Sequence, residues 1–224
     1  MSAPDVRAFT VGPVQENCYI VRADPQAPSA VIVDPGDEPE RLLDAAAALG
    51  VEIEAILLTH CHFDHIGAVA PVAAATGAPV YCPVIETALL TDIMSWVPPG
   101  FGPFQSHEPE HTVAGGERLE LAGMTFDVVF TPGHSPGHVT YAVSGALLSG
   151  DVLFQGSVGR VDLPGGDWST LEASIAGLIG AYPQETVVYP GHMGITTLGR
   201  ELATNPFLTE LRELSPAPQP ASGS

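Results

Sequence analysis

The sequence predicts an α/β fold in which two β-sheets are covered by helices. Segments with strand character occur in both halves of the chain and helical segments lie between them. The chain has 224 residues, of which 45% are hydrophobic, and this is enough to bury a substantial core. No apolar run reaches the roughly 18 residues that a membrane span requires. We expect one domain over residues 1–214.

The first half alternates short apolar strands with Ala- and Leu-rich helices. Turn residues bound the expected strands, which are Val6–Thr10, Cys18–Arg22, Ala30–Val33, Ala55–Leu58 and Pro79–Cys82. The expected helices are Glu38–Leu49, His65–Thr76 and Val84–Thr91. The turn Asp34-Pro35-Gly36 should end the third strand, and Gly50 suits the C-cap of the first helix. Pro71 is a candidate kink within the second helix.

The second half begins with a long loop and then repeats the pattern. Asp92–Glu110 holds four Pro and two Gly, a composition typical of a functional cover or a disordered segment. The expected strands are Arg118–Leu121, Thr125–Phe130, Thr140–Val143, Leu147–Leu148 and Thr186–Tyr189. The expected helices are Trp168–Ile179, capped by Asp167, and Phe207–Leu214, capped by Asn205 and preceded by Pro206. The Pro- and Ser-rich tail 215–224 should be disordered.

Charge and termini exclude several classes of partner. The sequence has 26 acidic residues, seven arginines and no lysine, and the net charge of -19 should repel nucleic acid and anionic membranes. The first ten residues lack the apolar stretch of a signal peptide. We therefore expect a cytoplasmic protein whose three cysteines are free thiols.

The run Thr59-His60-Cys61-His62-Phe63-Asp64-His65 is the main functional signal. It places three histidines and one aspartate directly after an apolar strand. His60 and His62 are two residues apart and face the same side in extended backbone. Imidazole and carboxylate together suit Zn, Fe or Mn better than Ca or Mg. A chance polar cluster at a helix start is the alternative, and this number of ligand-type residues makes it improbable.

Three later strands also end at a ligand-type residue. His134, Asp151 and His192 each follow a Gly at the end of an apolar segment. Glycine permits close backbone approach and unusual backbone angles. A lone histidine is more often structural, but several strand ends with metal-type residues together indicate one site.

The ordered series of these residues resembles the metallo-β-lactamase fold over about Ala8 to Leu214. The resemblance implies an αββα sandwich with the site at one edge of the two sheets, and two divalent ions per chain, zinc first, with iron or manganese possible. It implies a first metal held by His60, His62 and His134. It implies a second metal held by Asp64, His65 and His192, with Asp151 bridging both.

Such a pair of ions supports hydrolysis without a Ser or Cys nucleophile. Two divalent ions a few ångströms apart can share a hydroxide whose pKa they lower towards neutrality. The hydroxide attacks a carbonyl, and a metal stabilises the oxyanion that forms. Asp64 is the candidate catalytic residue because its carboxylate can orient the hydroxide and carry its proton.

Several other residues near the candidate ligands are not expected to bind metal. Asp34 is a candidate to accept the second N–H of a ligating histidine, with a plain turn role as an equal alternative. His138 is expected to be structural, because the family places its ligand at the first His of such a Gly-His-x-x-Gly-His run. Cys61 should point away from its flanking histidines. His107 and His111 should be solvated.

Two segments narrow the resemblance to the glyoxalase II branch in its short bacterial form. They are Gly150–Asp167 and the stretch from Gly191-His192 to Asn205-Pro206-Phe207. This branch hydrolyses S-acyl glutathione thioesters, usually S-lactoylglutathione. Arg160 matches a basic position near glutathione, with a structural role as an equal alternative. Asp162 and Gly194 stand where those enzymes carry tyrosines. The resemblance therefore supports a small-molecule thioester substrate but not the recognition of its glutathione part.

Other members of the fold remain alternatives. Persulfide dioxygenases share the Gly-Arg-x-Asp segment and use one iron, held by counterparts of His60, His134 and Asp151. The longer match at the C-terminal end favours the hydrolase. The negative charge disfavours a nuclease, and the expected location and the Asp at position 151 disfavour a β-lactamase. A non-catalytic module is the weakest option, because no ligand has been lost.

Overall fold

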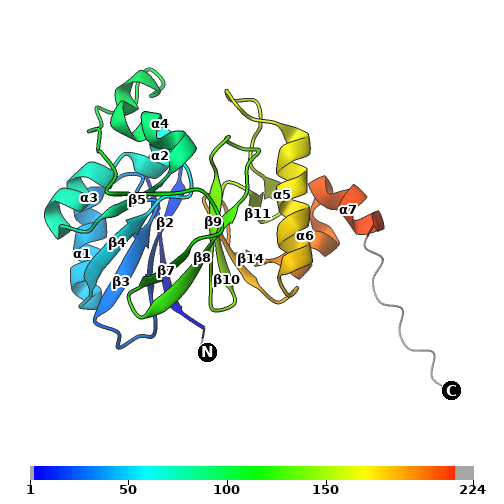
Figure 1. The fold of residues 1–224 in the computed structure, drawn as a ribbon, viewed down its shortest axis with the longest axis horizontal. Coiled ribbons are helices and arrows are strands. Elements are labelled where there is room, and N and C mark those ends of the chain that lie inside the picture. Colours follow the sequence, from blue (N-terminus) through cyan, green and yellow to red (C-terminus); the bar gives the residue numbers. More distant parts are fainter. Residues whose placement is uncertain (1–2, 215–224) are drawn as a thin grey trace.

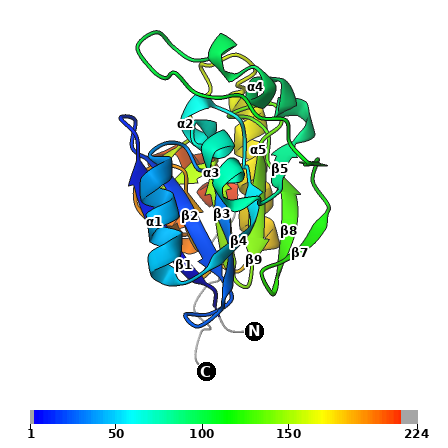
Figure 2. The same ribbon diagram turned by 90° about the vertical axis from the view of Figure 1, so that its left-hand side faces the viewer.

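Two six-stranded sheets pack face to face and carry helices on both outer faces (Figures 1 and 2). The computed structural model describes residues 3–214. The predicted αββα sandwich is confirmed, whereas the predicted disorder of 215–224 lies outside the described residues. Within the described part of the chain, no helix is both long and apolar enough to cross a membrane.

The first sheet begins as an antiparallel meander and continues with parallel strands. Its order follows the sequence: β1 (Asp5–Val11), β2 (Glu16–Arg22), β3 (Ser29–Val33), β4 (Glu52–Leu57), β5 (Val80–Pro83) and β6 (His111–Val113). The helices in this half are α1 (Pro39–Leu49), α2 (Phe63–Ile66), α3 (Val69–Thr76) and α4 (Thr87–Thr91). Because β3, β4 and β5 run parallel, their carboxyl ends meet at one edge of the sheet.

The second sheet has the order β14-β13-β10-β9-β8-β7. Its strands are β7 (Arg118–Leu121), β8 (Met124–Phe130), β9 (Val139–Val143), β10 (Ala146–Gly150), β13 (Val187–Pro190) and β14 (Thr196–Thr197). The remaining elements are β11 (Leu153–Phe154), β12 (Ser157–Val158), α5 (Trp168–Ala181), α6 (Leu198–Thr204) and α7 (Thr209–Leu214). β10 and β13 pair in parallel, and α5 lies in the connection between them.

Three apolar cores hold the four layers together. Tyr141 and Phe126 are completely buried between the two sheets. Leu42 of α1 packs in a cluster on the outer face of the first sheet, and Leu171 and Ile175 of α5 do so on the outer face of the second. Burial on both faces explains why the central strands have apolar runs rather than strict alternation.

The predicted helix His65–Thr76 is wrong as one element. The chain forms α2 and α3, which are interrupted at Gly67 and Ala68. The backbone N–H of Ala68 donates to the carbonyl of Pro35 at 3.0 Å, so it leaves the helical pattern. Pro71 lies in the first turn of α3, where a missing N–H costs nothing, and it causes no kink.

The predicted caps are confirmed, and several short elements were missed. Asp167 accepts the N–H of Thr170 at 2.8 Å at the start of α5, and Asn205 accepts the N–H of Phe207 at 3.0 Å. Gly50 ends α1 with a φ of 68°. The missed elements are β6, β11, β12, β14 and α6, which are too short to show a period.

Candidate metal centre

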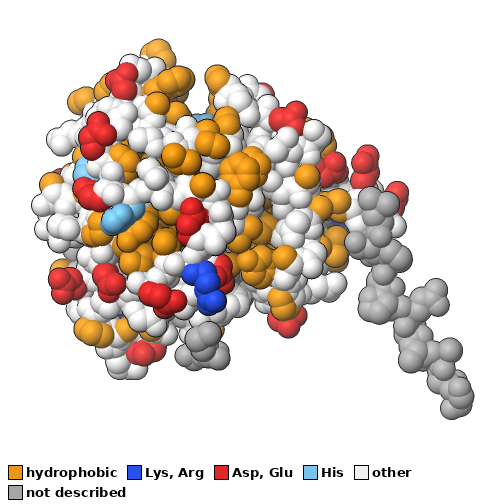
Figure 3. All heavy atoms as spheres, in the orientation of Figure 1, with side chains coloured by type: hydrophobic (Ala, Val, Ile, Leu, Met, Phe, Trp, Pro, Cys, Tyr) orange, Lys and Arg blue, Asp and Glu red, His pale blue; other side chains and the backbone are white. Residues whose placement is uncertain are grey.

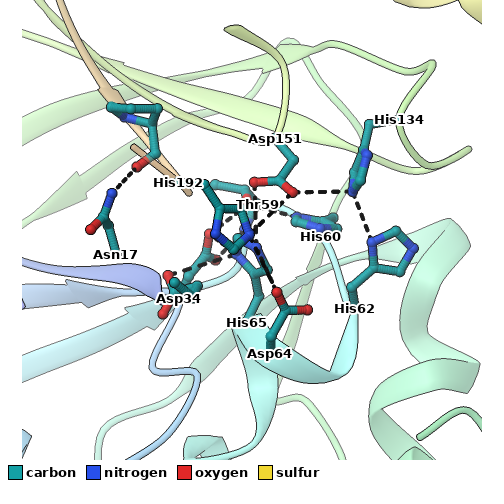
Figure 4. Close-up of polar contacts among 12 residues, drawn as sticks. Asn17, Asp34, Thr59, His60, His62, Asp64, His65, His134, Asp151 and His192 are labelled. Atoms are coloured by element: carbon teal, nitrogen blue, oxygen red, sulfur yellow. Dashed lines mark hydrogen bonds and ion pairs between the residues drawn. The ribbon is translucent and has the colours of Figure 1, made fainter. Parts of the chain in front are cut away.

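Side chains from four segments converge at the edge shared by the two sheets (Figure 4). The segments follow β4, β8, β10 and β13, and the first of them includes helix α2. They bring together all seven predicted ligands: His60, His62, Asp64, His65, His134, Asp151 and His192. On the molecular face in Figure 3, acidic side chains are widely spread and basic ones occupy one small area, in keeping with the net charge of -19.

The first group consists of three imidazoles. One ring nitrogen from each of His60, His62 and His134 lies within 4.8 Å of the others. His62 Nδ1 and His134 Nε2 are 2.8 Å apart. His60 is completely buried, and its ring centroid is 4.9 Å from that of His134. Three imidazole nitrogens facing one point are a typical donor set for a transition metal.

The second group combines one carboxylate with two imidazoles. His192 Nε2 is 3.3 Å from Asp64 Oδ2, and His65 Nε2 is 3.9 Å from the same oxygen. His65 is fully buried, whereas Asp64 and His192 are half-buried. This group therefore borders the solvent, where a substrate can reach it.

Asp151 lies between the two groups. Its Oδ1 is 3.4 Å from His65 Nε2, and its Oδ2 is 3.4 Å from His134 Nε2. The same Oδ2 is 3.6 Å from His192 Nε2. One carboxylate thus faces donors of both groups, which is the arrangement of a bridging ligand.

The polar atoms at the centre fit a cation better than they fit one another. His60 Nε2, His65 Nε2 and Asp151 Oδ1 are buried without a hydrogen-bond partner. Buried polar atoms are normally paired, so orphans aimed at a common space need an explanation. A divalent ion satisfies such nitrogens and oxygens together, and the His and Asp donors suit Zn, Fe or Mn.

The surroundings of the candidate ligands shift their pKa values. Burial alone would raise the pKa of Asp151, but His65, His134 and His192 hold it well below its usual range. Burial and the neighbouring imidazoles lower the pKa of His60 well below its usual value, and burial and His134 lower that of His62 to about 4. An ionised carboxylate and neutral imidazoles are the protonation states that bind metal.

His65 differs from the other histidines because carboxylates surround it. Burial alone would lower its pKa, yet Asp151, Asp34 and Asp64 raise it well above the usual value. A proton on His65 Nε2 would therefore compete with a metal ion for this nitrogen. Metal binding should release that proton.

Asp34 supports two neighbouring ligands. Its Oδ2 lies 3.0 Å from His65 Nδ1, so it can accept the ring N–H on the side away from the centre. It also accepts the backbone N–H of Thr59 at 2.7 Å and the Thr59 hydroxyl at 2.6 Å. The Thr59 hydroxyl is in turn 3.0 Å from His60 Nδ1. This geometry favours the supporting role over a plain turn role.

His138 and Cys61 occupy structural positions, as expected. His138 Nε2 accepts the backbone N–H of Asp151 at 3.0 Å, and its Nδ1 lies 3.0 Å from the Thr131 hydroxyl. Cys61 is buried with its Sγ 3.4 Å from that of Cys82, pointing into the apolar core. The His138 ring also stacks on that of His60, with centroids 4.9 Å apart.

The two remaining histidines lie away from the centre. His107 is half-buried, with Nε2 3.4 Å from Glu110 Oε2. His111 is exposed, as predicted, but it begins the short strand β6 and its ring lies against Tyr81 at a centroid distance of 4.5 Å. His107 was predicted to be solvated, and the structure places it only half in solvent, beside Glu110.

Glycine at position 191 is required by close packing at the centre. A Cβ there would lie 2.2 Å from Asp151 Oδ1 and 2.6 Å from His65 Cε1. The loop is fixed from the other side by Asn17, whose Nδ2 donates to the carbonyls of Pro190 at 3.1 Å and Met193 at 2.9 Å. The sequence had indicated the glycine, but nothing indicated Asn17.

Glu86 is a supporting residue that the sequence did not reveal. Its buried carboxylate accepts the N–H of Cys61 at 2.7 Å, the N–H of Gly137 at 2.9 Å and the hydroxyl of Ser135. It therefore joins the loop of His60 and His62 to the loop of His134. An isolated Glu at the junction of a 3-10 turn and a helix gives no signal of this, since the partners are remote in sequence.

Arg160 meets the centre through its backbone and not through its guanidinium. Its carbonyl lies 2.7 Å from His134 Nδ1 and can accept that N–H. Its exposed guanidinium donates to both carboxylate oxygens of Asp162, at 2.6 and 2.8 Å. The backbone contact fits the structural alternative, and the proposed contact with substrate stays a prediction.

An αββα sandwich with a His/Asp centre at the shared edge of its sheets defines a class of metal-binding proteins. A family model described as the metallo-beta-lactamase superfamily matches residues 11–192. The chain belongs to this superfamily.

Two similar proteins bear the names of hydrolases. The chain is 39% identical to the probable metallo-hydrolase YqgX of Bacillus subtilis, covering 90% of this chain and 96% of the relative. It is 32% identical to the hydroxyacylglutathione hydrolase GloC of Haemophilus influenzae, covering 91% and 98%.

Two solved structures share the fold at high coverage. BLEG-1, described as a B3 metallo-beta-lactamase, is 41% identical with a TM-score of 0.86, covering 92% of this chain and all of that one. TTHA1623, described in a di-iron-bound form, is 44% identical with a TM-score of 0.74, covering 90% and 100%.

Proposed function

We propose that this protein is a two-metal hydrolase that cleaves a thioester. His60, His62 and His134 would hold one divalent ion, and Asp64, His65 and His192 the other. Asp151 would serve both. The position of the Asp151 carboxylate, within 3.4 to 3.6 Å of nitrogens from both groups, carries this proposal.

The residues around the centre divide the work of hydrolysis. When bound, the two ions would polarise a carbonyl and make water nucleophilic at neutral pH. Asp64 would orient the attacking water and hold its proton at a carboxylate oxygen, because it is half-buried and borders the cleft. The hydrogen bond from His192 keeps the pKa of Asp64 low, against the opposing effect of burial. Asp34 would fix the orientation of His65.

The name of one relative supports a thioester as the substrate class. GloC bears the name of a hydroxyacylglutathione hydrolase, and the chain spans almost its full length. S-Acyl glutathione, with S-lactoylglutathione as the first example, is therefore the first candidate. Thioester cleavage needs no strong acid at the leaving group, since a thiolate leaves readily. The remaining requirements are a nucleophilic water and stabilisation of the oxyanion, which a metal centre can supply.

Purified protein is expected to carry about two metal ions per chain, as zinc or a mixture with iron or manganese. Elemental analysis should be paired with a panel containing S-lactoylglutathione, an uncharged acyl thioester, a β-lactam and glutathione persulfide. Thioester hydrolysis with two metals would support the proposal. One iron per chain with oxygen uptake on the persulfide would replace it by a dioxygenase. Turnover of the β-lactam alone would also overturn it.

Arg160→Ala is expected to raise KM for S-lactoylglutathione about tenfold and to change kcat little, because a remote ionic contact gives uniform binding energy. An uncharged thioester should be unaffected. Asp162 now holds this guanidinium, so Asp162→Asn should lower the same KM. Arg118→Ala is the matched control, since Arg118 is also exposed and paired, with Asp127 at 3.1 Å. Equal losses on both substrates would show that Arg160 only supports its loop.

A further inference from the structure

An open pocket of about 400 Å³ adjoins Asp64. It lies between the turn that joins β1 to β2 and the loop that joins α4 to β6, and α2 contributes Phe63 and Asp64. In Figure 2 the turn and the loop reach out on the same side of α2. Asp64 belongs both to the lining of this pocket and to the second ligand group, so the pocket borders the centre where a substrate would react.

Aromatic side chains build one wall of this pocket. Phe63 of α2 packs against Phe101 at a ring-centroid distance of 4.8 Å and against Phe104 at 6.3 Å. Phe104 is seated over Gly67, where a Cβ would come within 2.7 Å of its ring. The loop is thus packed onto the helix next to Asp64. Val11 at the end of β1 and Val14 of the following turn complete the apolar lining.

The charges in the pocket disfavour an anion. The pocket lining belongs entirely to the described part of the chain. Its ionisable residues are Asp37 and Asp64, and it contains no lysine or arginine. Away from the metal-holding Asp64, a carboxylate in this pocket would meet Asp37 and no basic side chain. Arg160 contacts His134 of the first ligand group through its backbone carbonyl, and its exposed guanidinium pairs with Asp162. The two flanks of the centre therefore differ in the groups that they can accept.

We propose that this pocket binds the acyl arm of the thioester, and that the preferred acyl group is apolar, uncharged and larger than lactoyl. The inference rests on the proposed function. The scissile carbonyl must lie at the metal centre, so the acyl and thiol parts of the substrate extend in different directions from it. A thiol arm with carboxylates would lie towards Arg160, and the acyl arm towards Phe101 and Val14. A short hydroxyacyl group would leave most of the pocket unfilled, against the close fit of ordinary ligand sites.

The test compares acetyl and octanoyl thioesters of one uncharged thiol, N-acetylcysteamine, with the metal-loaded protein. The wild-type kcat/KM should be at least about tenfold higher for octanoyl, because buried methylenes each add binding energy. Val14→Asp should remove about tenfold for octanoyl and leave acetyl within about twofold. Val14 is 37% exposed, so the variant should fold. Trp96→Ala is the control, because Trp96 is 55% exposed and lies outside the pocket lining.

Calorimetry with the ketone analogue of the octanoyl thioester, in which a methylene replaces sulfur, gives a readout independent of turnover. Binding that Val14→Asp weakens and Trp96→Ala does not would support the pocket. Equal rates on both thioesters, or a Val14→Asp loss shared by acetyl and octanoyl, would overturn the inference while leaving the hydrolase intact. Failure to hydrolyse either thioester at full metal content would instead reject the proposed function, and ketone binding would then decide the pocket alone.

Discussion

Asp151→Ala is expected to lose bound metal and turnover together. The carboxylate faces His65 Nε2 and His134 Nε2 at 3.4 Å each, so its removal leaves imidazoles of both groups without their shared anionic partner. Even partners that only orient a ligand change metal affinity by about 10–100-fold, and removing a ligand of both ions should exceed that range. Metal content by elemental analysis and kcat on a thioester should therefore fall in parallel.

Asp151→Asn separates charge from shape in the same experiment. The amide keeps an oxygen at the centre and fills the same space, but it lacks the negative charge that attracts two cations. It should retain more metal than Asp151→Ala and far less activity than the wild type. Asp127→Ala is the control, because Asp127 is an exposed acid paired with Arg118. A variant at position 151 with full metal content and full activity would show that Asp151 does not serve both ions.

The candidate ligands could be found from sequence because local chemistry marks them. Three histidines and one aspartate fall within a few residues after a buried strand, and His134, Asp151 and His192 each follow a glycine. β8, β10 and β13 run in the same direction in the second sheet, so the residues that follow them emerge at one edge of it. The same logic gave Asp34, at the end of β3. That each of these residues holds metal stays a prediction.

The supporting contacts could not be found in the same way, because they join segments far apart in sequence. Asn17 contacts the loop of His192 across more than 170 positions. The division of the predicted helix 65–76 depends on Pro35, whose carbonyl accepts the N–H of Ala68. The partner of the Arg160 guanidinium could not be predicted either, because sequence does not distinguish a substrate carboxylate from Asp162.

Glu86→Ala is expected to destabilise the fold and to weaken metal binding. The variant leaves the N–H groups of Cys61 and Gly137 and the hydroxyl of Ser135 buried without an acceptor. Each lost acceptor costs about 1–3 kcal/mol, so the free energy of unfolding should fall by about 3 kcal/mol or more. Urea denaturation of the metal-free protein measures this loss, and competition with a chelator measures metal affinity.

Glu86→Gln and Glu201→Gln distinguish positioning from general stability. Glutamine at position 86 can still accept from Gly137, but its amide would face the N–H of Cys61, so metal affinity should fall about tenfold with a smaller loss of stability. Glu201 is equally buried and accepts from Gly156 at 2.8 Å and Asn205 at 2.9 Å, and neither is a predicted ligand. Its variant should lose comparable stability and keep its metal affinity. Equal metal affinity in both variants, at a temperature where both are folded, would show that Glu86 has only a structural role. A loss of metal affinity confined to Glu86→Gln would mean that its carboxylate sets the spacing between His62 and His134.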